Sequence, residues 1–377
     1  MTEKRNRLRE IQAFGQSVWY DNISRDLLES GELRRLVEED GISGVTSNPT
    51  IFEKAIRTGK TYDRDLERLA REGRSPKEAY EALAIDDIRA AADLLREVYE
   101  RTGGKDGYVS FEVSPHLARD TEGTIAEARR LHQAVGRENV MIKVPATPEG
   151  IPAIEELLAE DVPVNVTLMF SLRHYTAVAE AYLRGIERRA RAGKPLDRVA
   201  SVASVFVSRI DTAVDKELEE KPEAREFLGR TGIANAKVIY GKFRELFRGP
   251  RFRRLEEKGA RVQRPLWAST STKNPRYSDV LYAEALIGPD TIDTMPPATI
   301  EAFRDHGVAA NRLETDLEGA KWLLDELPKF GIDLDAVMER LQVEGVEAFA
   351  RSFDELLATV EAKLAAFSGP GAAKSAK

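Results

Sequence analysis

The sequence predicts a (β/α)8 barrel of the α/β class, decorated with extra helices. Two observations lead to this prediction: short apolar runs rich in Val, Ile and Thr recur eight times, and amphipathic helical patterns separate them. The alternative is a doubly wound open sheet, which usually has a glycine-rich turn after its first strand. The first run is instead followed by DNIS, with no GxGxxG or GxxxxGK[ST] motif, and this favours the barrel.

The eight expected strands are mostly continuous in apolar character, as suits parallel strands that are covered on both faces. They span residues 17–21, 43–48, 108–114, 139–146, 162–170, 199–208, 264–270 and 291–296.

Helical patterns fill the intervals, starting with an N-terminal helix and one continuous pattern over residues 24–40. Residues 51–107 hold two or more helices and form an insertion between the second and third strands, and residues 297–368 add several more. No linker divides the chain, so we expect residues 1–368 to form a single barrel domain. The last residues, 369–377 (GPGAAKSAK), are predicted to be a disordered tail.

The composition excludes several kinds of function. The chain has 377 residues, a formal net charge of −7 and no cysteine, so it has no disulfide or thiolate metal site and no global basic field for nucleic acid or an anionic membrane. The four histidines lack metal-ligand spacing, and no signal peptide or membrane span is evident. We therefore expect a cytoplasmic protein whose anionic ligands meet a local cluster of cations and backbone N–H groups.

Polar side chains stand near the carboxyl ends of seven of the eight expected strands. In a barrel these ends converge on one face, where the active site lies. The residues are Asp21, Asn48, Glu112, Lys143, Asn165 with Thr167, Ser204 with Phe206, and Ser269.

Lys143 is the most informative of them because it lies within the apolar run VMIKVPA. A charged ammonium group is costly to bury there, and a neutral amine can attack a carbonyl to form a Schiff base. The alternative is a structural ion pair with Glu112. Glu112 itself could relay protons during such chemistry.

Asp21 and Asn48 each have a functional and a structural interpretation. Asp21 could act as a second acid/base group, or it could cap the following helix, although Asn22 and Ser24 could cap it as well. Asn48 precedes Pro49, so a pure turn role is also open.

Arg209 follows the sixth strand at a helix start, where an arginine and backbone N–H groups can hold a phosphate. The alternative is a surface ion pair with Asp211 or Asp215. Lys273, in STSTKNP, is a second candidate anion ligand.

The chain resembles the transaldolases of the pentose phosphate pathway in their longer bacterial form. The resemblance covers nearly the whole chain. Its strongest segments are VWYDNISR, GISGVTSNPTIFEKAI, VSFEVSP, VMIKVPATPEGIPAI, VNVTLMFSLRHY, SVASVFVSRIDTAVD, WASTSTKNPRYSDVLYAEALIG and TIDTMPPAT. The resemblance implies a class I aldolase barrel that uses no cofactor and no metal.

It also implies catalytic roles. Lys143 resembles the family's Schiff-base lysine, and Glu112 its proton-relay glutamate, which works with Thr167 and a bound water. Asp21 resembles the acid/base that handles the hydroxyl group next to the bond being cleaved.

The implied binding residues are Asn48 and Asn165 for the dihydroxyacetone hydroxyls, Ser204 and Phe206 for the pocket wall, and Arg209 for phosphate.

One segment departs from the family. Shorter transaldolases have a second phosphate arginine two residues beyond the serine that matches Ser269. In this chain either Lys273 replaces that arginine across an insertion or Ser271 occupies its place.

The reaction implied by the resemblance moves a dihydroxyacetone unit from sedoheptulose 7-phosphate to glyceraldehyde 3-phosphate, giving erythrose 4-phosphate and fructose 6-phosphate. A fructose 6-phosphate aldolase, whose branch tends to have Gln and Tyr where this chain has Glu112 and Phe206, is one alternative. A non-catalytic barrel that binds sugar phosphates is the other. We expect a monomer or a homodimer that binds sugar phosphates and neither nucleic acid nor membrane.

Overall fold

Eight parallel strands close into a barrel in chain order, with β8 pairing with β1. The computed structural model describes residues 6–368. The strands are β1 (Gln16–Tyr20), β2 (Gly44–Val45), β3 (Tyr108–Glu112), β4 (Val140–Pro145), β5 (Val164–Met169), β6 (Ser201–Phe206), β7 (Arg264–Ala268) and β8 (Thr291–Met295).

The barrel prediction is confirmed, and every predicted strand is present. Most are shorter than predicted. β2 retains only two residues, because residues 46–48 leave the sheet to enter a helix. The predicted 369–377 tail lies outside the described residues.

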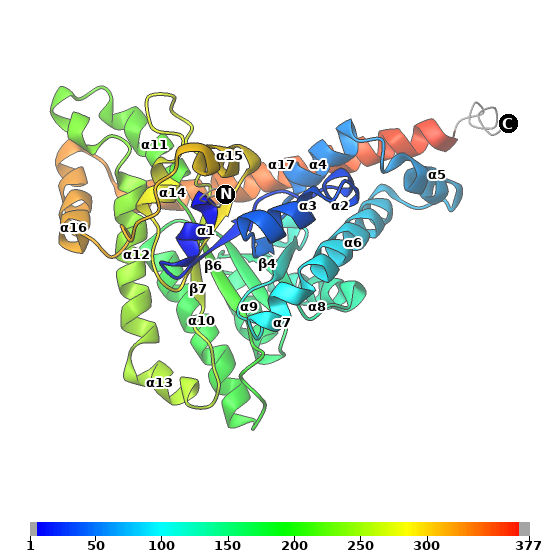
Figure 1. Ribbon diagram of the computed structural model, residues 1–377, viewed down its shortest axis with the longest axis horizontal. Helices are drawn as coiled ribbons and strands as arrows, with labels where there is room; N and C mark the ends of the chain where they lie inside the picture. Colours follow the sequence, from blue (N-terminus) through cyan, green and yellow to red (C-terminus); the bar gives the residue numbers. More distant parts are fainter. Residues whose placement is uncertain (1–5, 369–377) are drawn as a thin grey trace, which may run out of the picture.

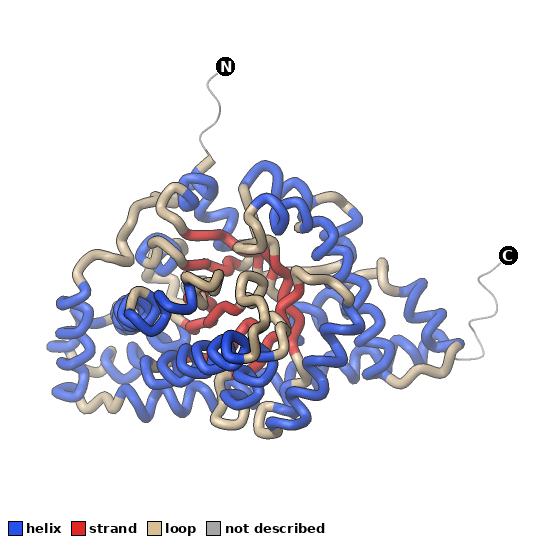
Figure 2. The backbone as a smooth tube through the Cα atoms, turned by 90° about the horizontal axis from the view of Figure 1, so that it is seen from below, coloured by secondary structure: helices blue, strands red, loops and turns tan. Residues whose placement is uncertain are grey.

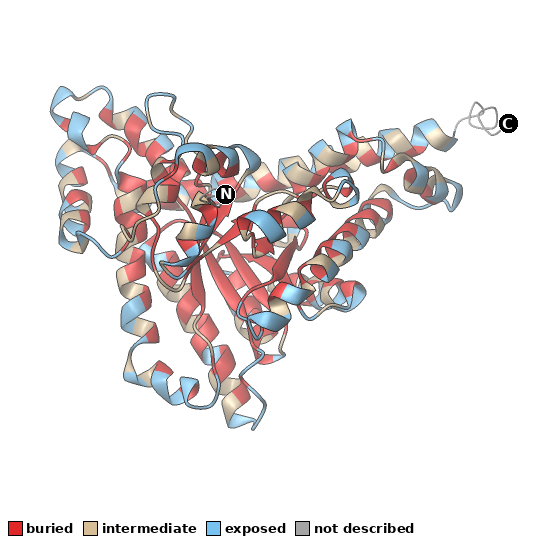
Figure 3. Ribbon diagram, in the orientation of Figure 1, coloured by how far each residue is buried: buried red, intermediate tan, exposed pale blue. Residues whose placement is uncertain are grey.

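The strands lie at the centre of the molecule and helices surround them (Figure 2). Most strand residues are buried, whereas the surrounding helices are buried on one face and exposed on the other (Figure 3). This pattern follows from the sequence, since continuous apolar runs suit strands covered on both sides and 3.6-residue periodicity suits helices covered on one.

One helix precedes the first strand, and others lie between the strands or follow the last of them. They are α1 (Arg7–Gln12), α2 (Arg25–Glu29), α3 (Glu32–Arg35), α8 (Thr121–Val135), α9 (Gly150–Ala159), α10 (Leu172–Arg191), α11 (Ser208–Leu218), α12 (Thr231–Phe247), α13 (Pro250–Glu256), α14 (Leu281–Ala285) and α15 (Pro297–His306). Short single turns are the π-helix η1 (Leu36–Asp40) and the 3-10 helices η2 (Pro115–Leu117), η3 (Pro222–Phe227) and η4 (Leu327–Phe330).

Residues 24–40 were predicted as one continuous helical pattern. The structure divides them into three consecutive pieces: α2, α3 and η1. Gly31 has a φ of +78°, a left-handed conformation that ends α2 and starts α3. The Ser24 side chain caps α2 by accepting a hydrogen bond from Leu27 N. Asp21 is therefore not needed as the cap of this helix.

The 51–107 insertion contains helices, as predicted. It comprises most of α4 (Pro49–Thr58), with α5 (Asp63–Arg71), α6 (Pro76–Leu94) and α7 (Arg96–Arg101). The C-terminal additions after α15 are α16 (Leu317–Glu326) and the long helix α17 (Leu334–Ser368).

Helix α17 crosses the molecule at the end of the barrel where the strands finish (Figure 1). It contacts α4, α5 and α6 from the insertion and α11 and β5 from the barrel. The Gln342 side chain donates to the backbone oxygens of Ala146, at 2.9 Å, and Leu168, at 3.0 Å. These bonds tie α17 to the ends of β4 and β5, so the two additions together cover the mouth of the barrel.

No helix in residues 6–368 is both long and apolar enough to cross a membrane.

Candidate active site

A cavity of about 260 Å³ opens at the carboxyl ends of the strands. Its walls come from strand ends, from the starts of α4 and α11, and from α17. The lining residues are Asp21, Thr46, Asn48, Thr50, Ile51, Lys143, Asn165, Thr167, Ser204, Phe206, Arg209, Ala268, Ser269, Thr294 and Phe349. Nine of the eleven residues predicted from the sequence line it, and the exceptions are Glu112 and Lys273.

Lys143 extends from β4 between Glu112 of β3 and Asn165 of β5, its register neighbours. Only 7% of its side chain is exposed. The amine donates to the Ser47 carbonyl at 2.9 Å and lies 3.4 Å from Glu112 Oε2. The ion pair with Glu112 does not exclude a reactive role for the Lys143 amine, because the Glu112 carboxyl group is close enough to exchange a proton with it.

Glu112 is not among the residues that line the cavity. Burial raises the pKa of its carboxyl group, although the nearby charge of Lys143 opposes the shift. Within the described residues, neither Glu112 Oε2 nor Thr167 Oγ1 has a hydrogen-bond partner, and both atoms are buried. Glu112 Oε2 lies beside the Lys143 amine and Thr167 lines the same cavity, and unpartnered atoms of this kind suit a bridging water, which needs several polar partners. The arrangement supports a relay from Lys143 to Glu112 through water and Thr167.

Asp21 follows the last residue of β1 and accepts a hydrogen bond from Thr46 Oγ1 at 2.6 Å. The Thr294 hydroxyl lies 2.6 Å from the same Thr46 oxygen. Enclosure in the barrel mouth raises the pKa of the Asp21 carboxyl, against the lowering effects of Thr46 and of the Lys143 charge. Asp21 is thus a fixed carboxyl group, held by one hydroxyl and facing the cavity that contains the amine.

Asn48 was predicted to end a strand, but in the structure it is the N-cap of α4. Its Oδ1 accepts a hydrogen bond from Ile51 N at 3.0 Å. This bond leaves the side-chain NH2 group for a ligand in the cavity. The structural role of Asn48 is therefore that of a helix cap, and the cap orients the amide that lines the cavity.

A chain of hydrogen bonds crosses three strands at the cavity floor. Ser204 Oγ donates to Asn165 Oδ1 at 2.7 Å, and Asn165 Nδ2 donates to Ser110 Oγ at 2.9 Å. The chain fixes which way the Asn165 amide points. All three side chains are buried, so they form a rigid polar floor.

Arg209 lies in the first turn of α11, with its guanidinium 5.2 Å from the centre of the Phe206 ring. Burial lowers the pKa of this guanidinium. No carboxylate in residues 6–368 pairs with it. Asp211 instead accepts a hydrogen bond from Gly232 N at 2.7 Å, and Asp215 accepts one from Gly229 N at 3.0 Å. The alternative of a surface ion pair is therefore wrong, and a partly buried cation without a counter-ion is left facing the cavity.

Ser269 and Lys273 follow β7 but lie differently. Ser269 lines the cavity with a positive φ of +56°, and its hydroxyl is 3.0 Å from that of Ser208. Lys273 is exposed on the loop, where its amine donates to Ser271 Oγ at 2.6 Å. Its charge nevertheless lowers the pKa of Asp21, so the loop lies close to the mouth.

Six lining residues are not among those predicted from the sequence: Thr46, Thr50, Ile51, Ala268, Thr294 and Phe349. Thr46 and Thr294 are ordinary threonines at or just after strand ends. In the TIDTM run, Thr294 lies two residues after Ile292 and therefore on the same face of the strand, which could have indicated it. Phe349 comes from α17, and its ring centre lies 5.9 Å from Lys143 Nζ. Nothing in an amphipathic helical pattern shows which apolar residue covers a distant site. No group of residues in the described range has the composition and spacing of a metal site.

Comparison with known proteins gives a consistent result. Residues 18–360 match the model of a family described as Transaldolase/Fructose-6-phosphate aldolase. A "Transaldolase 2" of Nostoc punctiforme is 49% identical over 373 residues, covering 95% of this chain and 98% of the relative. A "Transaldolase" of Thiobacillus denitrificans is 50% identical over 357 residues, covering 94% and 99%. A "Transaldolase" of Thermobifida fusca is 48% identical over 362 residues, covering 95% and 98%.

Proposed function

Since the chain belongs to the transaldolase/fructose-6-phosphate aldolase family, we propose that it transfers a dihydroxyacetone unit between sugar phosphates through a Schiff base on Lys143. It is an enzyme, a transaldolase. The donor is sedoheptulose 7-phosphate and the acceptor is glyceraldehyde 3-phosphate, and the products are erythrose 4-phosphate and fructose 6-phosphate. The observation that supports the proposal best is the buried Lys143 amine, 3.4 Å from a carboxyl group and inside a cavity that also contains an unpaired arginine.

The reaction begins when the neutral Lys143 amine attacks the ketone carbon of the donor. The carbinolamine that forms loses its hydroxyl as water and becomes an iminium ion. Both steps move protons, and Glu112 exchanges them with the reacting atoms through the water that it shares with Thr167. The raised pKa of Glu112 suits this task, because a carboxylate with a raised pKa is a stronger base than an ordinary glutamate.

Cleavage follows when Asp21 accepts the proton of the C4 hydroxyl. The C3–C4 bond breaks, its electron pair moves into the iminium to give a neutral enamine, and an aldose phosphate leaves. The reverse sequence with a different aldose phosphate completes the transfer. Thr46 holds the Asp21 carboxyl in place with its 2.6 Å hydrogen bond.

The remaining residues hold the sugar. We propose that Asn48 and Asn165 bind the hydroxyls of the dihydroxyacetone part and that Ser204 and Phe206 line its wall. Arg209 binds the phosphate, with the N–H groups at the start of α11 beside it. Either Lys273 or Ser271 provides the second phosphate contact, and Ser269 lines the substrate cavity before them.

Two alternatives are tested by one assay on the purified protein. Fructose 6-phosphate is supplied with erythrose 4-phosphate, and both sedoheptulose 7-phosphate and free dihydroxyacetone are measured. A transaldolase produces the ketose and little dihydroxyacetone. A predominance of dihydroxyacetone would identify an aldolase, and the absence of both products would leave only a sugar-phosphate binding protein.

Phe206 is proposed to protect the enamine until the acceptor arrives. An apolar ring cannot donate a proton or hold a water, and Phe206 packs 5.5 Å from the Phe170 ring at the cavity edge. Phe206→Tyr adds one hydroxyl group at nearly constant volume, and this hydroxyl can position a water for the enamine carbon. We expect the variant to remain folded, to lose transferase activity and to release dihydroxyacetone from fructose 6-phosphate. A parallel fall, or no change, in both activities would mean that Phe206 is only a packing residue.

Arg209→Ala is expected to weaken the capture of phosphorylated sugars. A hydrogen bond to a charged group contributes about 1.5–3 kcal/mol, so kcat/KM should fall roughly 10- to 150-fold. Arg68→Ala removes an exposed arginine from α5 and is the matched control. Unchanged kinetics in Arg209→Ala would refute the phosphate assignment.

We also propose that the enzyme works in the cytoplasm, where charged sugar phosphates are retained, and that it is a monomer or a homodimer. Cell fractionation and sedimentation equilibrium test these two points.

A further inference from the structure

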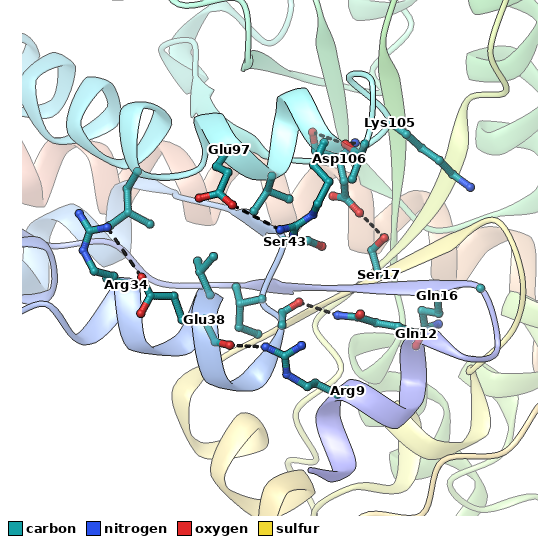
Figure 4. A pocket seen from close by; sticks show the side chains of 18 of the residues that line it. Arg9, Gln12, Gln16, Ser17, Arg34, Glu38, Ser43, Glu97, Lys105 and Asp106 are labelled. Carbon is teal, nitrogen blue, oxygen red and sulfur yellow. Dashed lines mark hydrogen bonds and ion pairs between the residues drawn. The ribbon is translucent and has the colours of Figure 1, made fainter.

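A second cavity, of about 590 Å³, is drawn in Figure 4. It lies at the opposite end of the barrel from Lys143. Gln16 and Ser17 at the start of β1 and Arg264 at the start of β7 contribute to it, so it opens at the amino ends of the strands. Its other walls are α1, α3, η1, the end of α6, α7 and the loop between α7 and β3. It shares no lining residue with the catalytic cavity.

The charge in this cavity is positive, although the chain as a whole is negative. Five cationic side chains and three carboxylates line it. The cations are Arg9, Arg34, Arg101, Lys105 and Arg264, and the carboxylates are Glu38, Glu97 and Asp106. An anion is therefore attracted here by a local field that the overall charge of −7 would not suggest.

The cations at the rim are held loosely. Arg34 lies 3.9 Å from Glu38 and Arg101 lies 3.7 Å from Glu97, both beyond hydrogen-bonding distance. Both arginine side chains are about two-thirds exposed, at 65% and 67%. Such pairs contribute little to stability, so a ligand can take over their donors at small cost.

The floor contains polar atoms that lack partners. Arg264 is buried, pairs with Asp106 at 3.5 Å, and donates to Ser17 Oγ at 2.5 Å and to Thr291 O at 2.7 Å. Its Nε has no partner among the described residues. The Oε1 atom of the buried Gln16 has none either. An unpartnered arginine N–H group is unusual in a protein interior, and both unpartnered atoms belong to side chains that line this cavity.

Part of the cavity lining is apolar. Val37 of η1, Ile42 after it, Leu94 of α6 and Val98 of α7 contribute to it. Figure 4 shows Arg34 and Lys105 toward opposite ends of the view, with Arg9 on the lower side. A partly apolar lining that also contains cations suits a molecule that has both a flat or apolar body and a charged group, and the volume is in the range of small-molecule sites.

We propose that this cavity binds a phosphorylated small molecule with an apolar or aromatic body, of the nucleotide class, at a site separate from the catalytic one. The apolar body lies against Val37, Leu94 and Val98, and the phosphate group meets Arg34 and Arg101. This inference does not depend on the reaction proposed for Lys143.

The test is calorimetric titration of the full chain with ATP and, separately, with inorganic phosphate. We expect ATP to bind more tightly than phosphate, and Arg34→Ala/Arg101→Ala to weaken ATP binding about tenfold or more. Arg68→Ala/Arg71→Ala is the matched control, because both arginines are exposed and lie on α5, outside the residues that line the cavity. The control variant should bind ATP like the wild type, and so should Arg209→Ala.

Circular dichroism and thermal unfolding verify that each variant is folded. If the double variant misfolds, Leu94→Asp replaces it, since a carboxylate in the apolar part of the lining should also weaken ATP binding. The proposal is overturned if ATP does not bind, if it binds no better than phosphate, or if only Arg209→Ala weakens it. The last result would place the nucleotide in the catalytic cavity.

Discussion

Lys143→Arg should abolish catalysis, with kcat lowered by on the order of 10⁴-fold or more, because no other group at the cavity can form the Schiff base. A guanidinium remains charged at all accessible pH values and is not a nucleophile. The fold should be preserved, because arginine keeps the positive charge opposite Glu112. The measurements are transferase activity and the thermal unfolding midpoint.

The control is Lys242→Arg on α12, which removes a partly exposed lysine paired with Glu245 and should leave activity unchanged. If Lys143→Arg lowers the unfolding midpoint strongly, Lys143→Met, of similar length and uncharged, separates loss of the amine from misfolding. More than a few per cent of wild-type activity in a folded variant of Lys143 would contradict the proposed mechanism.

Asp21→Asn should have the next largest effect. General acid–base catalysis contributes typically 10²- to 10⁴-fold, and we expect kcat to fall within that range. Asparagine preserves the size of the side chain, so substrate binding and KM should change little. The matched control is Asp26→Asn, an exposed residue of α2.

The pH profile gives a second readout for Asp21. The carboxyl must be ionised to accept the C4 hydroxyl proton, so kcat should fall as the pH falls through its pKa. Because enclosure raises this pKa, the fall should occur above the range of an ordinary aspartate. A wild-type-like kcat in Asp21→Asn would show that another group accepts the proton.

Much of the barrel could be predicted because its signals are local. Each strand is a short apolar run, and each run suits burial on both faces. The errors arose where one residue redirects the chain. Gly31 divides the 24–40 pattern, and the chain leaves β2 so early that Asn48 caps α4 instead of ending a strand.

The site could be predicted only as far as the strand ends reveal it. Lys143, Asn165 and Ser204 project from strands, and the barrel brings strand ends together whatever the loops do. Phe349 reaches the cavity through α17, which is attached by Gln342 to the ends of β4 and β5. Contacts of this kind depend on three-dimensional packing, and helical periodicity alone cannot indicate them.

The structure also decided between interpretations that the sequence left open. Acidic residues near Arg209 in the sequence made a surface ion pair plausible. Asp211 and Asp215 instead accept hydrogen bonds from backbone N–H groups. Ser24 caps α2, which removes the structural explanation for Asp21. In both cases the result depends on which donor lies nearest in space.

The most direct test of the account is borohydride reduction of the enzyme in the presence of fructose 6-phosphate, followed by peptide mapping. Cleavage releases the aldose phosphate before reduction, so the account predicts a three-carbon adduct without phosphate on Lys143 and on no other lysine. The buried amine of Lys143 is the one that the cavity offers to a ketone. An adduct on a different lysine, or no adduct with an active enzyme, would contradict the Schiff-base mechanism.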